Sequence, residues 1–322
     1  MIKIFTMVKD EVDIVYDWIV YHSTIFGNDN IYVIDNYSTD GTYEILQKNI
    51  LSTNLFREKD YTKKGIYMTK LINTYAQDMI AFPIDIDEFI VYYNNNNKNI
   101  YIDKKLILLY LNNLPKARVY KADFIWSLIT NENGYNRATV ESNEGMYKSI
   151  NKLAKSFVNT TYFKGVFDHG NHLKCNDYFL TKICLIHFHS RNLPQMKAKI
   201  LNNILGLGYK NNIYYLKNLL DNDIFCRGNH HIKNQIEILN NTYKLEISKS
   251  NKNNIDLSLF NNYIKECTSL TIFNKNVILN EEQIMDVLTK IKGTLLKVVD
   301  NNYNNNNKLI EEKNSQTVNN LT

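Results

Sequence analysis

The sequence predicts an α/β protein with a mostly parallel sheet flanked by helices and a helical C-terminal extension. Over the first 100 residues, short β-branched and aromatic runs alternate with segments whose apolar residues recur at helical spacing, and the connections are short. From Pro194 onward the periodic segments are mainly helical. Because such a strand-helix order builds a doubly wound sheet, ligands are expected outside the carboxyl ends of its strands.

The elements are expected in a simple order. The first helix should end at Gly27, a plausible stop, since the residues before it that keep helical spacing are Val12, Val15, Ile19 and His22. A Ser/Thr/Asp cluster at 38–40 suits the N-cap of the second helix. Strands are expected at 2–8, 30–35, 79–85, 117–128, 152–158 and 182–189, and helices at 10–27, 38–49, 63–77, 102–114, 194–208, 212–222, 232–245 and 281–299.

Composition excludes several classes of protein. With 44% hydrophobic residues in 322, the chain can bury a full core. Its 38 Lys and Arg are opposed by 33 Asp and Glu without a basic run, so nucleic-acid binding is not indicated. The four cysteines lack Cys-x-x-Cys spacing and are interpreted as reduced thiols. No membrane span and no signal peptide are recognisable, so a soluble, cytoplasmic protein is expected.

Three acids follow the strand expected at 79–85. Asp85 and Asp87 are two residues apart, so in extended backbone they project to the same side, where two carboxylates repel unless a cation lies between them. Such oxygen ligands suit Mg²⁺ or Mn²⁺, which complete their shell with water and substrate phosphates. The alternative is a solvated loop, because an isolated Asp-x-Asp is common. Glu88, the third acid, has no assigned purpose.

Three segments together carry a family resemblance. They are "MVKDEVDIVYDWIVYHSTIFGNDNIYVIDNYSTDGT" at 7–42, "FPIDIDEFIV" at 82–91 and "LIHFHSRNLPQMKAK" at 185–199. In order and spacing they resemble GT-A-type glycosyltransferases of the family-2-like kind, including the family-92-type subgroup, over roughly the first 200 residues. The resemblance implies a GT-A-type, Rossmann-like sheet. It also implies a catalytic domain at 1–210, with a nucleotide-sugar half at about 1–100 and an acceptor half at about 101–210.

The resemblance also implies roles for individual residues. Lys9 and Glu11 would border the nucleotide. The usual pattern there is Lys-Asn-Glu, and this chain has Asp10 in place of the asparagine. Asp35 would contact the base and Asp40 would help shape that loop. Asp85 and Asp87 would be the metal-binding pair, with Asp87 the more direct ligand, and Glu88 would support the loop or face the sugar.

The late segment supplies further candidates. His187 and His189 share a side of a predicted strand, and a neutral imidazole is a reasonable third ligand for Mn²⁺; a buried structural histidine is the alternative. We favour His187 over His189. Arg191 could bind the diphosphate bidentately or form a surface ion pair. Lys155 resembles a family lysine for which phosphate contact is expected.

An inverting transfer also needs a base to take the acceptor proton. Asp168 is the first choice and His169 the second, because they lie in sequence between the elements on the diphosphate side and the late strand. Asp123, Glu141 and Glu144 are further candidates, although each is more commonly a surface acid. Trp126 could form a wall for the acceptor, or it could be part of the core.

The sequence therefore predicts a metal-dependent glycosyltransferase that moves a sugar from a nucleotide-sugar donor, a UDP-sugar in our expectation, to an acceptor hydroxyl with inversion. Mn²⁺ or Mg²⁺ is the expected cofactor, and the acceptor can be a glycan, a protein or a lipid. The alternatives are a sugar-phosphate nucleotidyltransferase, whose glycine-rich signature is missing near the first strand, and a non-catalytic carbohydrate-binding protein. A helical region at 211–300 could pair two copies, and the Asn-rich 301–322 is expected to be a flexible tail.

Overall fold

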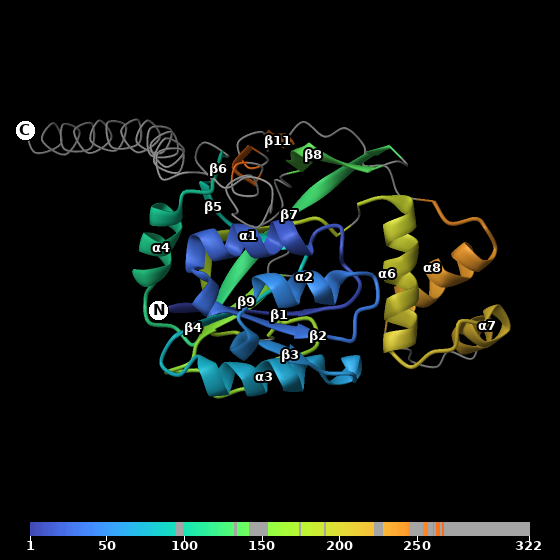
Figure 1. Cartoon of the computed structure of the whole chain (residues 1–322), viewed down its shortest axis with the longest axis horizontal. Helices are drawn as coiled ribbons and strands as arrows, with labels where there is room; N and C mark the ends of the chain where they lie inside the picture. Colours follow the sequence, from blue (N-terminus) through green and yellow to red (C-terminus); the bar gives the residue numbers. More distant parts are fainter. Residues whose placement is uncertain are drawn as a thin grey trace, which may run out of the picture. The chain divides into compact units, whose positions relative to one another are not determined.

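A sheet of eleven strands forms the centre of the computed structural model (Figure 1). Residues 1–265 make up one compact unit, and the second unit, 266–322, is described only at Glu266. The expected helix at 281–299, the Asn-rich tail, Ser190, Glu144, Cys226 and Cys267 lie outside the described residues. The structure describes residues 1–94, 99–131, 134–141, 154–173, 175–189, 191–221, 228–244, 254–256, 260, 262–264 and 266.

Most strands on the main path of the sheet run in one direction, as predicted. The path is β3-β2-β1-β4-β9-β7-β10-β5-β6, and the first four strands are all parallel. Strands β9 and β5 are antiparallel to both of their neighbours, so only these two are reversed on that path. The bounds are β1 Ile2–Val8, β2 Ile31–Asp35, β3 Leu55–Arg57, β4 Ile80–Pro83, β5 Glu88–Asn94, β6 Asn99–Tyr101, β7 Val119–Asn131, β9 Lys155–Asn159 and β10 Phe179–His187.

Two further strands, β8 (Gly134–Glu141) and β11 (Asn254–Asp256), extend the sheet from β7. The sequence patterns missed both, and they also missed β5 and the short strands β3 and β6. A strand of three residues shows too little alternation to be recognised without the neighbour that pairs with it.

Helices cover both faces of the parallel part of the sheet. Because side chains alternate along a strand, Ile4 of β1 packs in one core with Trp18, whereas the next residue, Phe5, packs in another core with Met68. In Figure 1, α1 and α2 lie on one side of β1 and β2, and α3 lies on the other. The bounds are α1 Val15–Phe26, α2 Thr42–Asn49, α3 Lys64–Tyr75 and α4 Lys104–Asn112.

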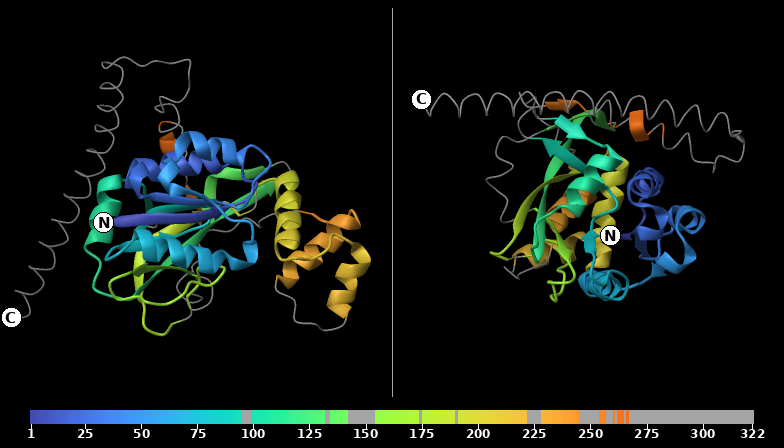
Figure 2. Two further views of the ribbon diagram at one scale, coloured as in Figure 1. Left: turned by 60° about the horizontal axis from the view of Figure 1, so that its bottom comes forward. Right: turned by 90° about the vertical axis from the view of Figure 1, so that its left-hand side faces the viewer.

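After the last long strand, the described residues include three helices of nine or more residues, as the helical spacing predicts. They are α6 (Leu193–Gly206), α7 (Ile213–Asp221) and α8 (Asn229–Leu239), and α8 contacts both of the others. Ile204, Leu216 and Ile232, one residue from each helix, make a small core of their own. Figure 2 shows α6 standing at one end of the strands, with α7 and α8 beyond it.

Two helix starts differ from the expectation. Helix α1 begins at Val15 rather than near residue 10, and α2 begins at Thr42 with Gly41 as its N-cap. Ser38 does not cap α2, because its hydroxyl accepts the Asp10 N–H at 3.0 Å. Asp40 likewise bonds the Val12 N–H at 3.0 Å. The Ser/Thr/Asp cluster therefore ties the loop after β2 to the loop after β1.

The remaining short elements are 3₁₀ helices at Asn28–Asn30, Ser52–Asn54 and Tyr61–Lys63. The two described cysteines, Cys175 and Cys184, are free thiols. No helix among the described residues has both the length and the apolar character needed to cross a bilayer.

Candidate active site at the carboxyl edge of the sheet

Strand direction brings several polar residues to one edge of the sheet. The carboxyl ends of β1, β4 and β10 lie at this edge, and so do the amino ends of the reversed strands β5 and β9. Asp85 and Asp87 follow β4, His187 ends β10, Glu88 begins β5 and Lys155 begins β9. Three stretches that lie far apart in the sequence, at 85–88, 155 and 187, therefore meet because of strand order.

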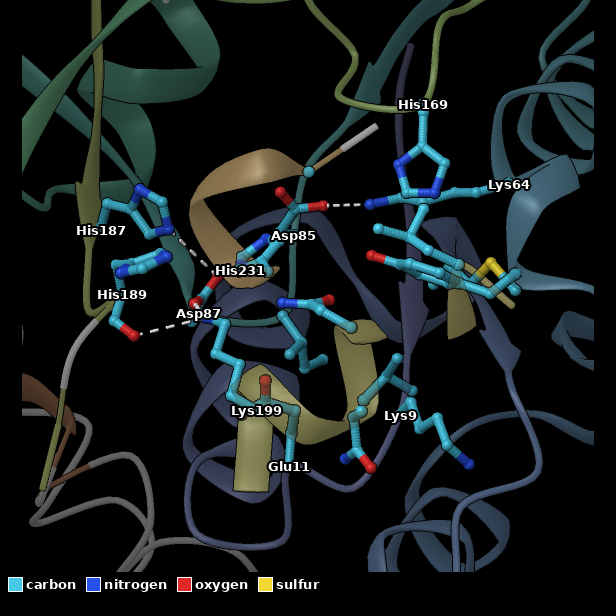
Figure 3. A pocket seen from close by; sticks show the side chains of 18 of the residues that line it. Lys9, Glu11, Lys64, Asp85, Asp87, His169, His187, His189, Lys199 and His231 are labelled. Atoms are coloured by element: carbon cyan, nitrogen blue, oxygen red, sulfur yellow. Dashed lines mark hydrogen bonds and ion pairs between the residues drawn. The ribbon is translucent and has the colours of Figure 1, made fainter. Parts of the chain in front are cut away.

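A cavity of about 310 Å³ opens at this edge, within the range of about 300–1,000 Å³ that is typical of small-molecule sites. Residues after β1, β4 and β10 form one side, and residues of α6 and of the start of α8 form another (Figure 3). Five of the chain's seven histidines line it. Its charged, histidine and amide side chains are Lys9, Glu11, Lys64, Asp85, Asp87, His169, His187, His189, Lys199, Asn202, Asn203, His230 and His231.

The predicted site residues divide into two groups. Lys9, Glu11, Asp85, Asp87, His169, His187 and His189 line the cavity. The following predicted residues are not part of its wall: Asp35, Asp40, Lys155, Asp168 and Arg191.

Asp85 lies between two ammonium groups. Its Oδ1 is 2.6 Å from Lys64 Nζ and its Oδ2 is 2.7 Å from Lys155 Nζ. Burial alone would raise the pKa of Asp85, but the charges of Lys155 and Lys64 outweigh it and hold the pKa below the usual carboxyl range. Lys64 is on the cavity wall, whereas Lys155 is only 1% exposed at its side chain. Asp85 is therefore ionised, with a cation at each oxygen.

Glu88, whose purpose the sequence left open, supports the acidic loop. Its Oε2 accepts the backbone N–H of Asp85 at 2.8 Å, and its Oε1 is 3.0 Å from Lys155 Nζ. The side chain is fully buried, and burial raises the pKa of Glu88 although Lys155 opposes that shift. Glu88 thus closes the turn between β4 and β5 from behind the cavity.

Asp87 is held from the α6 side. Its Oδ2 is 2.5 Å from Lys199 Nζ, and its Oδ1 is 3.4 Å from His187 Nε2. Burial would raise the pKa of Asp87, but Lys199 and His187 hold it well below its usual range. Figure 3 shows Asp85 and Asp87 together, with Lys64 on one side and Lys199 on another.

Arg191 is completely buried and acts as a clamp between two segments. It donates from Nη2 to Glu11 and from Nε to Asp13 Oδ2 at 2.7 Å, and Nη1 donates to the Phe188 carbonyl at 3.2 Å. Its Nη1 also lies 4.0 Å from Asp87. The predicted contact of Arg191 with a diphosphate stays a prediction; the guanidinium in this structure joins the segment after β1 to the segment after β10.

Two of the cavity histidines are neutral at physiological pH. The charge of Lys199, followed by burial, lowers the pKa of His189 well below 6.5. Burial and the neighbouring His230 lower the pKa of His231 to about 4. The rings of His230 and His231, at the start of α8, are 3.8 Å apart. Neutral imidazoles can donate and accept hydrogen bonds, so this wall suits hydroxyl-rich ligands.

The loops after β1 and β2 are bonded to each other beside the cavity. Lys9 donates to the carbonyls of Asn36 and Tyr37 at 3.2 and 3.1 Å. Asp35 is fully buried and accepts from Arg57 Nε at 2.9 Å. Asp40 Oδ1 accepts the Thr42 N–H at 3.0 Å, and its part in a donor-binding loop stays a prediction.

Asp10, which stands where the Lys-Asn-Glu pattern has asparagine, connects three segments of the structure. Asp10 has a positive φ of 51°, and its carboxylate accepts the Thr39 N–H at 2.7 Å and the Asn202 amide at 3.1 Å. A single side chain therefore connects the loops after β1 and β2 with α6.

The base candidates are separated by the structure. His169 lines the cavity with its ring 4.5 Å from that of Tyr61, whereas Asp168 is exposed and accepts the His172 N–H at 2.8 Å. Asp123 is buried in the sheet, and burial raises its pKa to about 6. Glu141 ends β8 opposite Trp126 in the strand register.

The cavity offers two side chains that could be ligands of a divalent ion, Asp87 and His187. Among the described residues, no group of three His, Cys, Asp or Glu side chains is arranged to hold a metal ion. Asp85 has a lysine at each oxygen, whereas Asp87 and His187 form a carboxylate-imidazole pair on the cavity wall. Since Mg²⁺ and Mn²⁺ commonly take one or two protein ligands and complete their shell with phosphate and water, this pair fits such an ion.

Sequence reasoning missed several residues on the cavity wall. Lys64 lies in a helix with no recognisable motif, Asn202 lies in a helix near the expected end of the catalytic domain, and His231 lies in the region assigned to the helical extension. Lys199 had a signal, because it is the last residue of the third segment of the resemblance. The doublet His230-His231 could also have been noticed, since adjacent histidines are unusual in a chain with seven.

Comparisons with known proteins leave the family open. No family model matches the chain, and no curated protein matches it. Membership of the family-2-like or family-92-type glycosyltransferases therefore stays a prediction.

Among solved structures the chain is similar to S. aureus TarS 1-349, at 11% identity over 73% of this chain and 70% of that one, with a TM-score of 0.30. It is also similar to a mannose-1-phosphate geranyltransferase from Thermus thermophilus, at 7% identity over 79% and 73%, with a TM-score of 0.25. A cytidylyltransferase from Leptospira borgpetersenii serovar Hardjo-bovis matches at 15% identity over 38% of this chain, with a TM-score of 0.25; the chain spans about half of its length, 53%.

At these TM-scores the class of the chain rests on its own topology. That topology, with the cavity where the parallel strands end, defines an α/β protein with a candidate ligand site at the carboxyl edge of its sheet.

Proposed function

We propose that the protein is a glycosyltransferase that moves a sugar from a nucleotide-sugar donor, a UDP-sugar in the first instance, to an acceptor hydroxyl. The observation that carries this proposal is the Asp87-His187 pair on the wall of a cavity that also holds Lys64 and Lys199. Paired acidic and imidazole groups for a divalent ion, beside ammonium groups for phosphate oxygens, are the chemistry that a nucleoside diphosphate leaving group requires.

The side chains on the cavity wall suggest how the donor would lie. Lys64 and Lys199 are the ammonium groups that can meet the diphosphate, since Lys155 and Arg191 are not on the wall. Lys9, beside the joined loops after β1 and β2, would border the nucleoside. The sugar would then face the histidine wall, where neutral His189 and His231 can bond its hydroxyls.

Asp87 and His187 would hold Mn²⁺ or Mg²⁺, which would supply Lewis-acid stabilisation of the diphosphate as it leaves. Asp85 has a separate task in this scheme. Because Lys64 and Lys155 neutralise it, Asp85 fixes Lys64 at the cavity edge and orients its ammonium group.

Inversion requires a base for the acceptor proton, and we assign that role to His169. It is the one of the two favoured base candidates that lines the cavity. Its imidazole would accept the hydroxyl proton as the acceptor oxygen bonds to the anomeric carbon, while the C–O bond to the diphosphate breaks.

The test is a screen of UDP- and GDP-sugars with Mn²⁺ that measures release of UDP or GDP with and without candidate acceptors. We expect release from one donor, loss of at least about 100-fold in Asp87→Asn, as is typical when transition-state charge loses its partner, and no change in Glu44→Gln on exposed α2. Release of pyrophosphate from UTP and a sugar phosphate would favour a nucleotidyltransferase instead. Absence of any release, with nucleotide still bound, would favour a binding protein.

A further inference from the structure

Lys199 forms an ion pair with the carboxylate of Asp87, which the proposed divalent ion would need as a ligand. Its ammonium lies 2.5 Å from Asp87 Oδ2, and it also donates to the His189 carbonyl at 3.3 Å. A lysine is charged at neutral pH, and this one makes a direct ion pair with the Asp87 carboxylate. An ammonium and a divalent ion at one carboxylate repel each other strongly in a poorly solvated site.

Of the cations near Asp87, Lys199 is the one that can leave. Arg191 is 4.0 Å away and is fixed by Glu11 and Asp13 on the opposite side of its fork. Lys199 has 19% of its side chain exposed, lines the cavity and stands on α6, at the end of a flexible four-carbon stem. Its ammonium can reach into the cavity without any change in the sheet.

We propose that Lys199 is a resident counter-ion of Asp87 that exchanges places with a divalent ion when a nucleoside diphosphate binds. This inference rests on the proposed function. In the nucleotide-free protein the Lys199 ammonium neutralises Asp87, and once the donor is present the same ammonium pairs with a phosphate oxygen while Asp87 is released for the ion. The two ligands should therefore bind cooperatively, and by linkage each should improve the affinity for the other by the same factor.

The exchange makes an unusual prediction about substitution. Removing Lys199 should improve Mn²⁺ binding to the nucleotide-free protein, since it removes the competitor without touching Asp87 or His187. A lysine that only assisted the ion site or the fold would give the opposite result. The same substitution should weaken UDP binding, because the phosphate loses its ammonium partner.

The experiment measures Mn²⁺ affinity by calorimetry or by the spin resonance of free Mn²⁺, with and without UDP. Lys199→Met and Lys199→Gln should each bind Mn²⁺ at least about tenfold more tightly than wild type without UDP, which corresponds to about 1.4 kcal/mol. The factor by which UDP improves Mn²⁺ affinity should fall in both. Lys197→Met, two residues earlier on α6, is the matched control and should match wild type.

Unchanged or weaker Mn²⁺ binding in both Lys199 variants, with circular dichroism and unfolding transitions that show folded protein, would overturn the exchange. The glutamine variant guards against failure to fold, because its amide can still donate to Asp87. If wild type does not bind UDP at any Mn²⁺ concentration, the proposed function fails. The nucleotide-free titrations would then still decide whether Lys199 occupies the ion position.

Discussion

Replacing Lys155 with methionine should destabilise the protein by about 3–5 kcal/mol, the range for removing one partner of a buried charge pair. The side chain is 1% exposed, and its ammonium lies 2.7 Å from Asp85 and 3.0 Å from Glu88. Methionine fills most of the volume of the lysine stem, so little of the loss should come from a cavity. Most of the lost stability should come from removing the positive charge that compensates the fully buried carboxylate of Glu88.

The dependence on pH follows from Glu88. Burial raises its pKa in the folded protein, and loss of Lys155 should raise it further. A carboxyl group with a raised folded pKa contributes stability below its unfolded pKa and loses it as pH rises through the folded value. Urea unfolding of Lys155→Met should therefore show a larger deficit at pH 8 than at pH 5.

A double-mutant cycle measures the interaction energy between Lys155 and Glu88 apart from other effects of each substitution on stability. Adding Glu88→Gln to Lys155→Met should restore at least about 1 kcal/mol, within the range for residues in direct contact. A loss below about 1 kcal/mol for Lys155→Met, or strict additivity in the cycle, would refute the claim that this ion pair holds the acidic loop.

Three further predictions concern other buried ionisable groups. Asp123→Asn should stabilise the protein at pH 8 by about 1–3 kcal/mol, because burial raises the pKa of Asp123 from 3.8 to about 6, and urea unfolding should show this gain shrinking to nothing below pH 4. His22, whose pKa burial lowers to about 3, should stay neutral at pH 5 in an NMR titration of its ring; protonation between pH 5 and 7 would contradict its buried hydrogen bonds to the main chain of Trp18 and Ile90. Arg191→Lys keeps the charge but not the fork, so thermal unfolding should show a loss of about 2 kcal/mol or more, and a neutral result would remove the clamp from the account.

Asp85 and Asp87 could be predicted as candidate site residues because the end of a strand can be recognised from a few neighbouring residues. Asp85 and Asp87 follow a short apolar run directly, and β-strand periodicity and strand order together put them on the ligand edge. The same reasoning puts Lys9 and Glu11, which follow the first strand, at that edge, whereas His187 was a candidate because of its place in the segment that carries the resemblance. For the residues that follow a strand, a local pattern and a general rule about parallel sheets were enough.

The partners of those residues could not be predicted in the same way. Lys64 begins a helix on the other face of the sheet, and Lys199 lies 112 positions after Asp87, on a helix near the expected end of the catalytic domain. Arg191 looked like a phosphate ligand because a guanidinium suits phosphate and carboxylate equally. In this structure the guanidinium meets the carboxylates of Glu11 and Asp13, which no local pattern indicates, and its contact with a phosphate stays a prediction.

The central claim is that Asp87 is part of a site for a nucleoside diphosphate and a divalent ion, and the thermal midpoint tests it most directly. Wild-type protein should unfold at a higher temperature with Mn²⁺ and UDP together than the sum of their separate shifts predicts, because each ligand stabilises the folded state and improves the affinity for the other. Asp87→Ala should abolish this joint shift. An equal joint shift in Asp87→Ala, or none in wild type at millimolar UDP and Mn²⁺, would contradict the account.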